Sequence, residues 1–144
     1  MNDELARLYQ QVILDHNKSP RNYGPLDGAT HEARADNPLC GDVVTVRLVV
    51  AEGRIQAVRF EARGCAISRA TASLMTSAIA SGTLEAAARL RGEFEGLMAA
   101  PADSERAAAL GELTVVEGVR EFPSRIACAV LPWRALEAAL GGKR

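Results

Sequence analysis

The feature that most constrains this chain is a pair of β-branched segments joined by a short turn, with one cysteine just before the pair and another just after it. Residues 43–50 and 54–63 are rich in side chains that favour strands, and Ala51-Glu52-Gly53 lies between them. A three-residue loop that ends on a left-handed glycine is a common hairpin connection. The sequence therefore predicts an antiparallel hairpin over residues 43–63.

The length of this loop also predicts the register of the hairpin, because Val50 then pairs with Arg54. This register places apolar side chains on one face, whereas a slip of one residue would set Val58 against Arg47. At the end away from the turn, this register places Cys40 and Asp42 beside the end of the second strand, which leads into Cys65. The pairs that follow are Val46 with Val58, Val44 with Phe60, Asp42 with Ala62 and Cys40 with Gly64.

Two thiols and a carboxylate are thus expected at one end of the hairpin. Cys40 and Asp42 share a face if the chain stays extended, because side chains alternate along a strand. Cys65 follows the second strand directly and lies at the same end. The neighbouring glycines, Gly41 and Gly64, would let backbone segments approach closely there. These three side chains predict a shared site.

Composition excludes several classes of protein. A chain of 144 residues is expected to form one domain over residues 1–144, and a formal net charge of −1 gives no basic footprint for nucleic acid. No apolar run reaches the ~18 residues of a membrane span, and the acidic start is unlike a signal peptide, so a cytoplasmic protein is expected. Three cysteines, an odd number, indicate metal ligands or reactive thiols rather than a disulfide framework.

Helical spacing dominates outside the hairpin. Trp133, Leu136 and Leu140 are expected to face inward from the last helix, where Pro132 marks either a start near residue 131 or a kink in a helix that begins at residue 126. Residues 28–36 are interpreted as a short edge strand, and residues 113–122 receive no assignment. The predicted helices are 3–15, 67 to about 81 ended by Gly82, 84–99 capped by Thr83, about 102–111, and 126–140.

The third cysteine completes a candidate metal set. Cys65 and Cys128 are both predicted near helix N-termini, where the partial positive charge favours a thiolate. With Cys40 and Asp42 they make three sulfurs and one oxygen, a tetrahedral set suited to Zn²⁺ or to iron in a cluster. Each cysteine could instead be a small buried apolar residue, the favoured interpretation for Cys128 taken alone, and Asp42 could be a turn residue.

Three further residues, Arg125, His16 and His31, could contribute to this site. Arg125 could offset some of the negative charge of such a site, although its pattern favours a solvated surface cation. His16 and His31 do not have ligand-like spacing and are interpreted as surface or loop-packing histidines.

The ordered motifs resemble the IscU/SufU family, also called NifU-like. The resemblance runs over almost the whole chain, and it implies an α+β domain of the SufE/NifU-like kind: a small antiparallel sheet of about three strands covered on one face by helices. The motifs that carry it are Asp15-His16, Pro20-Arg21-Asn22, Asn37-Pro38-Leu39-Cys40-Gly41-Asp42, Gly64-Cys65-Ala66-Ile67-Ser68 and Arg125-Ile126-Ala127-Cys128.

Departures from the family pattern favour its SufU branch. The chaperone motif of IscU proteins, Leu-Pro-Pro-Val-Lys, is replaced here by Glu121-Phe122-Pro123-Ser124-Arg125, and Ala127 stands where IscU has a histidine. An extra segment lies within residues 85–120. These differences argue against an Hsp70-type chaperone partner and against a histidine ligand. The resemblance does not account for Pro132.

The resemblance implies work in iron–sulfur cluster assembly. Its SufU branch binds Zn²⁺ through the set that corresponds here to Cys40, Asp42, Cys65 and Cys128. It also implies a SufS-like cysteine desulfurase as sulfur donor, with downstream iron–sulfur acceptor proteins, and either a scaffold for a cluster or a sulfur relay. We expect Cys40 to accept the persulfide sulfur, because its loop belongs to no helix and can leave the metal at least steric cost.

Two other functions remain open from the residues alone. A zinc hydrolase or deaminase needs an open metal position and a general base, usually Glu or His. A purely structural zinc site needs four inert ligands and nothing more.

Overall fold

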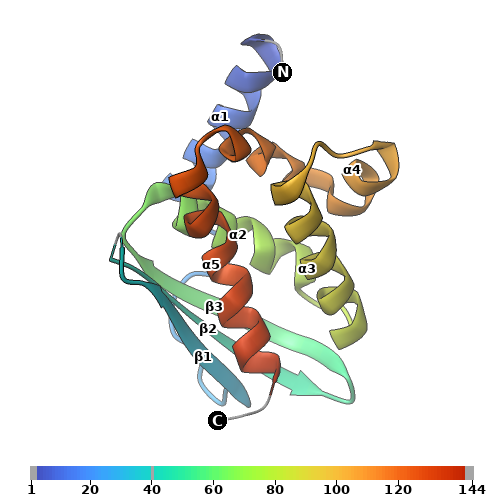
Figure 1. The fold of residues 1–144 in the computed structure, drawn as a ribbon. Helices are drawn as coiled ribbons and strands as arrows, with labels where there is room; N and C mark the ends of the chain where they lie inside the picture. The colour runs from blue at the N-terminus through green and yellow to red at the C-terminus, as the bar shows by residue number, and fades with distance from the viewer. Residues whose placement is uncertain (1–2, 40, 142–144) are drawn as a thin grey trace.

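The computed structural model describes residues 3–39 and 41–141, and it shows an antiparallel sheet with helices over one face (Figure 1). The three strands lie in the order β1-β2-β3. This confirms the predicted α+β architecture. In chain order the elements are α1 (Asp3–Lys18), β1 (His31–Asn37), β2 (Asp42–Ala51), β3 (Arg54–Arg63), α2 (Ala66–Ile79), α3 (Leu84–Ala99), α4 (Ser104–Leu110), the 3₁₀ helix η1 (Gly111–Glu121) and α5 (Pro123–Leu140).

The predicted hairpin forms, but its register differs from the prediction by two residues. Ala51 pairs with Arg54, so the turn holds only Glu52 and Gly53, and both have positive φ (56° and 75°). Positive φ at both central residues is the geometry of the tight turn that matches strand twist. The prediction instead assumed a three-residue loop, Ala51-Glu52-Gly53, with only its last residue in the left-handed region. A bulge between Val49 and Val50 takes up the remaining residue.

A shift of two residues keeps every side chain on its predicted face, because the strand repeat is also two. Val46 pairs with Phe60 and Val44 with Ala62, and all four side chains are buried. At the far end, Val43 pairs with Arg63. Asp42, rather than Cys40, therefore comes level with Gly64, the residue before Cys65.

The two faces of the sheet have different characters. The inner face packs against α2 and α5 around a core that includes Phe60, Trp133 and Leu136. The edge strand β1 presents half-buried alanines inward and exposed charges, Glu32 and Arg34 among them, outward. In the part of the chain that the structure describes, no helix is both long and apolar enough to cross a membrane.

The helix predictions succeeded where caps are clear and failed where they are not. Thr83 caps α3 by accepting a hydrogen bond from Ala86 N at 3.0 Å, as predicted. The last helix begins at Pro123, before either predicted start, because proline fits the first turn of a helix. It continues through Pro132. Trp133 and Leu136 face inward as predicted, whereas Leu140 is only half-buried.

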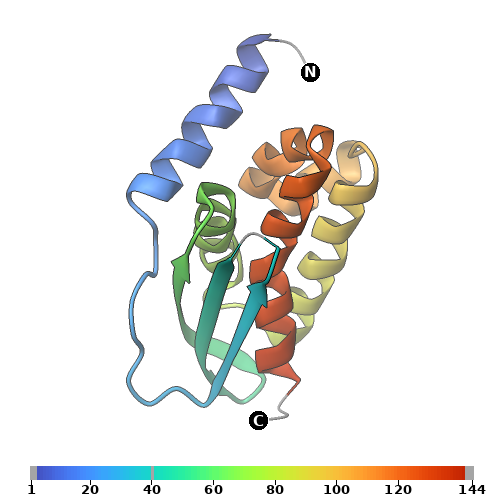
Figure 2. The same ribbon diagram turned by 60° about the vertical axis from the view of Figure 1, so that its left-hand side comes forward.

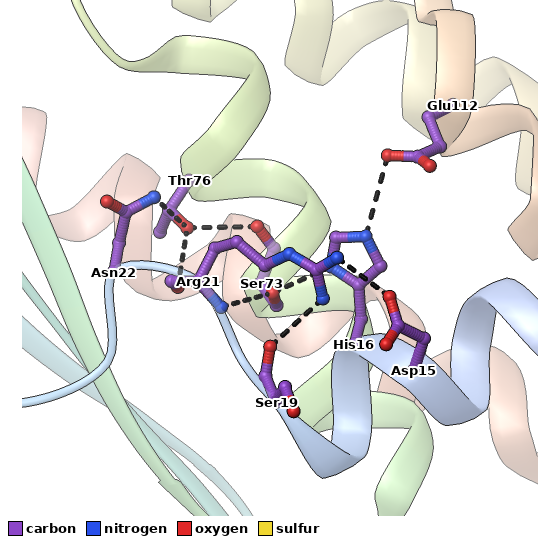
Figure 3. Close-up of polar contacts among 8 residues, drawn as sticks. All are labelled: Asp15, His16, Ser19, Arg21, Asn22, Ser73, Thr76 and Glu112. Atoms are coloured by element: carbon purple, nitrogen blue, oxygen red, sulfur yellow. Dashed lines mark hydrogen bonds and ion pairs between the residues drawn. The ribbon is translucent and has the colours of Figure 1, made fainter.

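A buried histidine fastens α1 to the rest of the fold (Figure 3). His16 is 3% exposed, and its Nδ1 lies 2.7 Å from the hydroxyl of Ser73 on α2. The same hydroxyl accepts a hydrogen bond from the backbone N–H of Arg21 at 2.8 Å. His16 Nε2 lies 3.5 Å from Glu112 on η1. His16 is therefore a packing histidine, one of the two interpretations of the sequence.

The segment after α1 covers the outer edge of β3, as Figure 2 shows. Gly24 donates its N–H to Phe60 O at 2.9 Å, and Phe60 donates to Asn22 O at 3.0 Å. Arg69 of α2 stacks its guanidinium over the ring of Tyr23 at 4.7 Å. These contacts pin the loop between α2 and the sheet.

Burial and the nearby Arg21 lower the pKa of His16 below its ordinary 6.5, although Glu112 and Asp15 oppose the shift. In the unfolded chain, His16 becomes protonated near pH 6.5, whereas in the folded protein it is still neutral at that pH. The free energy of unfolding should therefore fall as the pH drops from about 6.5 towards the folded pKa. Denaturant unfolding at several pH values should show this loss, and His16→Gln should remove it. His31→Gln controls for loss of a histidine elsewhere, and an unchanged slope in His16→Gln would contradict the assignment.

Candidate metal centre

Three of the predicted ligands converge at one end of the sheet. Asp42 is the first residue of β2, Cys65 caps the N-terminus of α2, and Cys128 lies on α5. One ligand atom from each lies within 4.8 Å of the other two. Asp42 and Cys128 are buried and Cys65 is partly exposed, so the described part of the site opens to solvent beside Cys65. Three elements that are distant in sequence thus meet at one point.

The carboxylate of Asp42 is held from both sides. Its Oδ1 accepts a hydrogen bond from the backbone N–H of Cys65 at 2.7 Å, and its Oδ2 accepts one from the hydroxyl of Ser68 at 2.7 Å. Both distances are typical of charge-assisted hydrogen bonds. The carboxylate thereby satisfies an N–H at the start of α2, where orphan donors and the helix dipole favour an anion.

Gly64 makes this contact possible. Its φ is +116°, and a Cβ at this position would overlap Oδ1 of Asp42. The sequence indicates that either flanking glycine, Gly41 or Gly64, would let backbone segments approach closely. Gly64 confirms it, but Gly41 does not: a Cβ there would meet no heavy atom within 4 Å among the described residues, and Gly41 is needed only for its φ of +77°.

Cys128 does not lie at a helix N-terminus, contrary to the prediction, because α5 begins five residues earlier at Pro123. The thiol lies in the second turn and is 2% exposed. Burial and the neighbouring Asp42 and Cys65 raise its pKa far above the ordinary value. Without a cation in the site this thiol is therefore protonated, and a metal ion would have to displace its proton.

Cys65 has the environment that the sequence predicted for it. Its sulfur accepts a hydrogen bond from Ile67 N at 3.4 Å as the N-cap of α2. Arg125 also donates to this sulfur, with Nη1 at 3.1 Å. The favoured interpretation of Arg125 as a mere surface cation is therefore wrong: its side chain is exposed, but its guanidinium lies against the site.

Cys40 lies outside the described residues. Its neighbours show where the chain passes, since Asn37 ends β1 and pairs with Asp42 at the start of β2. Between them, Gly41 N donates to Asn37 O at 2.8 Å and Leu39 N to Asn37 Oδ1 at 3.2 Å. The link from β1 to β2 therefore begins and ends at the residue pair that includes Asp42.

Ser68, a residue of the Gly64–Ser68 motif for which the sequence predicts no role at the site, is fully buried. Besides Asp42, its hydroxyl contacts the carbonyl oxygen of Cys128 at 3.0 Å. A polar residue three positions after a helix-capping cysteine was the available signal, because it lies one turn along the same helix face. Neither His16 nor His31 is grouped with the described ligands.

Comparison with known proteins identifies the family. The NifU-like N terminal domain matches residues 8–129. The chain belongs to this family. It is 38% identical over 136 residues to the zinc-dependent sulfurtransferase SufU of Bacillus subtilis, covering 94% of this chain and 91% of that protein. It is 37% identical to the iron–sulfur cluster assembly scaffold protein IscU of Streptococcus pyogenes, covering 95% and 85%.

Solved structures of the family show the same fold. A crystal structure described as an iron–sulfur cluster assembly scaffold protein for the SUF system, from Fervidobacterium islandicum, superposes with a TM-score of 0.85. It shares 30% identity and covers 93% of this chain and 97% of its own. The resemblance of the sequence to the IscU/SufU family is therefore confirmed.

Gly64→Ala should dismantle the contact between Asp42 and Cys65. The alanine would strain the backbone and displace the carboxylate from its donor. Gly24→Ala is the matched control, because its φ of +126° imposes similar strain with no atom within 4 Å of the new Cβ. Gly64→Ala should lower the free energy of unfolding by about 1.5–3 kcal/mol more than the control, the range for a hydrogen bond to a charged group. Equal losses in denaturant unfolding would contradict this account.

Proposed function

We propose that this protein accepts sulfur in iron–sulfur cluster assembly and holds a zinc ion through Cys40, Asp42, Cys65 and Cys128. The observation that carries the proposal is the convergence of three described ligand side chains, Asp42, Cys65 and Cys128, within 4.8 Å of one another. Two relatives that match over most of the chain, one named a zinc-dependent sulfurtransferase and one a cluster scaffold, support it.

The donor set fits zinc. Zn–S bonds of about 2.3 Å in a tetrahedral site place neighbouring ligand atoms about 3.8 Å apart. The three described donor atoms lie within 4.8 Å of one another, so small movements of their side chains would bring them to such a spacing. Three thiolates and one carboxylate would leave the site with a charge of −2, which Arg125 would partly offset. The same donors could also hold the iron of a cluster, the scaffold form of the proposal.

A bound zinc ion would keep its cysteine ligands as thiolates and shield them from oxidation. Among the three cysteines, Cys40 suits sulfur acceptance best. Cys128 is 2% exposed, and Cys65 caps α2 and contacts Arg125, so both are held by their helices. Cys40 belongs to the link between β1 and β2. A partner that supplies a replacement ligand would release Cys40 at low cost.

The transfer would then be a thiol–disulfide type of exchange. The Cys40 thiolate attacks the outer sulfur of a persulfide on a SufS-like cysteine desulfurase. The S–S bond of that persulfide breaks, and the desulfurase cysteine departs as a thiolate. The outer sulfur moves to Cys40 with its proton, so the step needs no external oxidant or reductant. Downstream assembly proteins in the cytoplasm would take the sulfur, and the protein would not act as a stand-alone enzyme.

A purely structural zinc site is the second candidate, because Asp42 and Cys128 are both buried. It differs from a relay in the accessibility of Cys40. A mild alkylating reagent applied to the native, zinc-loaded protein should modify Cys40 first if the protein is a relay. Protection of all three cysteines equally would favour the structural role.

Purified protein should contain about one zinc ion per chain. Cys65→Ser, Cys128→Ser and Asp42→Asn should each lose most of it and lower the unfolding temperature, because metal binding is coupled to folding. Asp36→Asn, an exposed carboxylate on β1, is the matched control and should keep its zinc. Elemental analysis is the measurement, and equal zinc content in wild type and the Cys65 and Cys128 variants would overturn the four-ligand site.

Incubation with a cysteine desulfurase and free cysteine should add one sulfur atom to Cys40. Mass spectrometry of peptides locates the added mass, and Cys40→Ser should abolish stimulation of the desulfurase even where some zinc remains. Sulfur on Cys65 or Cys128, or full stimulation by Cys40→Ser, would contradict the assignment.

A further inference from the structure

A buried serine touches two of the described ligand residues at once. Ser68 is 0% exposed, and its hydroxyl oxygen lies 2.7 Å from Oδ2 of Asp42 and 3.0 Å from the carbonyl oxygen of Cys128. Ser68 stands on α2, one turn after Cys65, while Asp42 begins β2 and Cys128 belongs to α5. One hydroxyl thus joins the three elements that carry the described ligands.

Pro132 explains why the carbonyl of Cys128 is bonded from another helix. In an α-helix this carbonyl would accept a hydrogen bond from the N–H of residue 132. Proline has no N–H, so this helical bond is missing inside α5. The hydroxyl of Ser68 lies 3.0 Å from this carbonyl oxygen and can share its proton with it.

The contact with Asp42 fixes the direction of the carboxylate. Cys65 N–H holds Oδ1 and Ser68 holds Oδ2, each at 2.7 Å, so the plane of the group is set by two donors on α2. The hydroxyl has one proton for its two acceptors. Because the carboxylate is charged and closer, it receives the stronger bond.

We propose that Ser68 is a positioning residue that aligns Asp42 and Cys128 for a metal ion, and that Pro132 strengthens the second of these contacts by removing the helical N–H that would compete for the Cys128 carbonyl. The proposal rests on the metal site of the proposed function. Outer hydrogen bonds of this kind orient metal ligands, and their loss typically weakens metal binding 10–100-fold.

Ser68→Ala tests the role, with Ser73→Ala as the matched control. Ser73 is equally buried on the same helix, but it bonds His16 and Arg21 instead of the ligand residues. In a chelator competition, Ser68→Ala should weaken zinc binding about 10–100-fold. Ser73→Ala should change zinc binding less than about threefold, even though it lowers stability through its lost bonds.

The Co²⁺-substituted protein gives a readout that a merely structural serine would not move. Its visible absorption bands report the ligand geometry, so they should shift in Ser68→Ala and stay in place in Ser73→Ala. Wild-type zinc affinity and unchanged Co²⁺ bands in Ser68→Ala would overturn the positioning role.

Pro132→Ala separates the two contacts of Ser68. It supplies an N–H to the carbonyl of Cys128, so this carbonyl no longer depends on the serine. In metal-free protein, Ser68→Ala should raise the unfolding equilibrium constant about fivefold or more in the wild-type background. In the Pro132→Ala background, Ser68→Ala should raise the unfolding equilibrium constant by a clearly smaller factor. Equal effects in both backgrounds would overturn the part assigned to Pro132.

The effect of Ser68→Ala on zinc affinity should not depend on residue 132, because the bond between Ser68 and Asp42 does not involve Pro132. Ser68→Ala should weaken zinc binding in both backgrounds, and the Pro132→Ala background keeps the test possible if the single variant folds poorly. Zinc in the wild type with unchanged affinity in Ser68→Ala would refute the positioning role alone. Absence of zinc from the wild type would refute the metal site of the proposed function and this role together.

Discussion

The carboxylate of Asp42 is the point on which the site depends. It stands at the start of β2, yet its two oxygens are bonded to the backbone of Cys65 and to the side chain of Ser68, both from α2. An anion at a helix start is favourable, and here it ties the sheet to the helix that follows it. Gly64 leaves room for the contact, and Arg125 supplies positive charge beside Cys65. The residues that hold the charge of the site, Asp42 and Cys65, are therefore also the ones that join β2 to α2.

Local patterns predicted most of the fold. Alternating apolar residues determined which face of the hairpin is buried, and the caps at Thr83 and Cys65 placed two helix starts. The register was wrong because the turn holds two residues rather than three: Glu52 takes a positive φ, which a non-glycine residue adopts only rarely, and a bulge lies between Val49 and Val50. Residues 113–122 lack a period because they lie largely in a 3₁₀ helix, whose spacing differs from the one sought.

The site was predictable to the extent that it is local. Asp42 and Cys65 follow from the hairpin, because sequence neighbours at one hairpin end are neighbours in space. Cys128 entered the set as a third cysteine expected at a helix N-terminus, whereas in the structure the packing of α5 against the sheet and α2 brings it to the site. Ser68 and Arg125 were missed or undervalued for the same reason: their contacts join residues 26 and 60 positions apart. From the sequence, Pro132 only predicts a helix start or a kink. In the structure it lies inside α5, where it cannot donate to the carbonyl of Cys128, and this carbonyl contacts the hydroxyl of Ser68 instead.

The open edge of the sheet has a consequence for behaviour in concentrated solution. β1 is the outermost strand of the described sheet, and exposed strand edges invite pairing between molecules. Its outward residues are Glu32, Arg34 and Asp36, all exposed and of alternating sign. Stacking a second copy there would set charged side chains against one another with little apolar surface to gain. Charged side chains on an edge strand are a common protection against such pairing, and the opposite edge at β3 is covered by residues 22–24 of the chain itself.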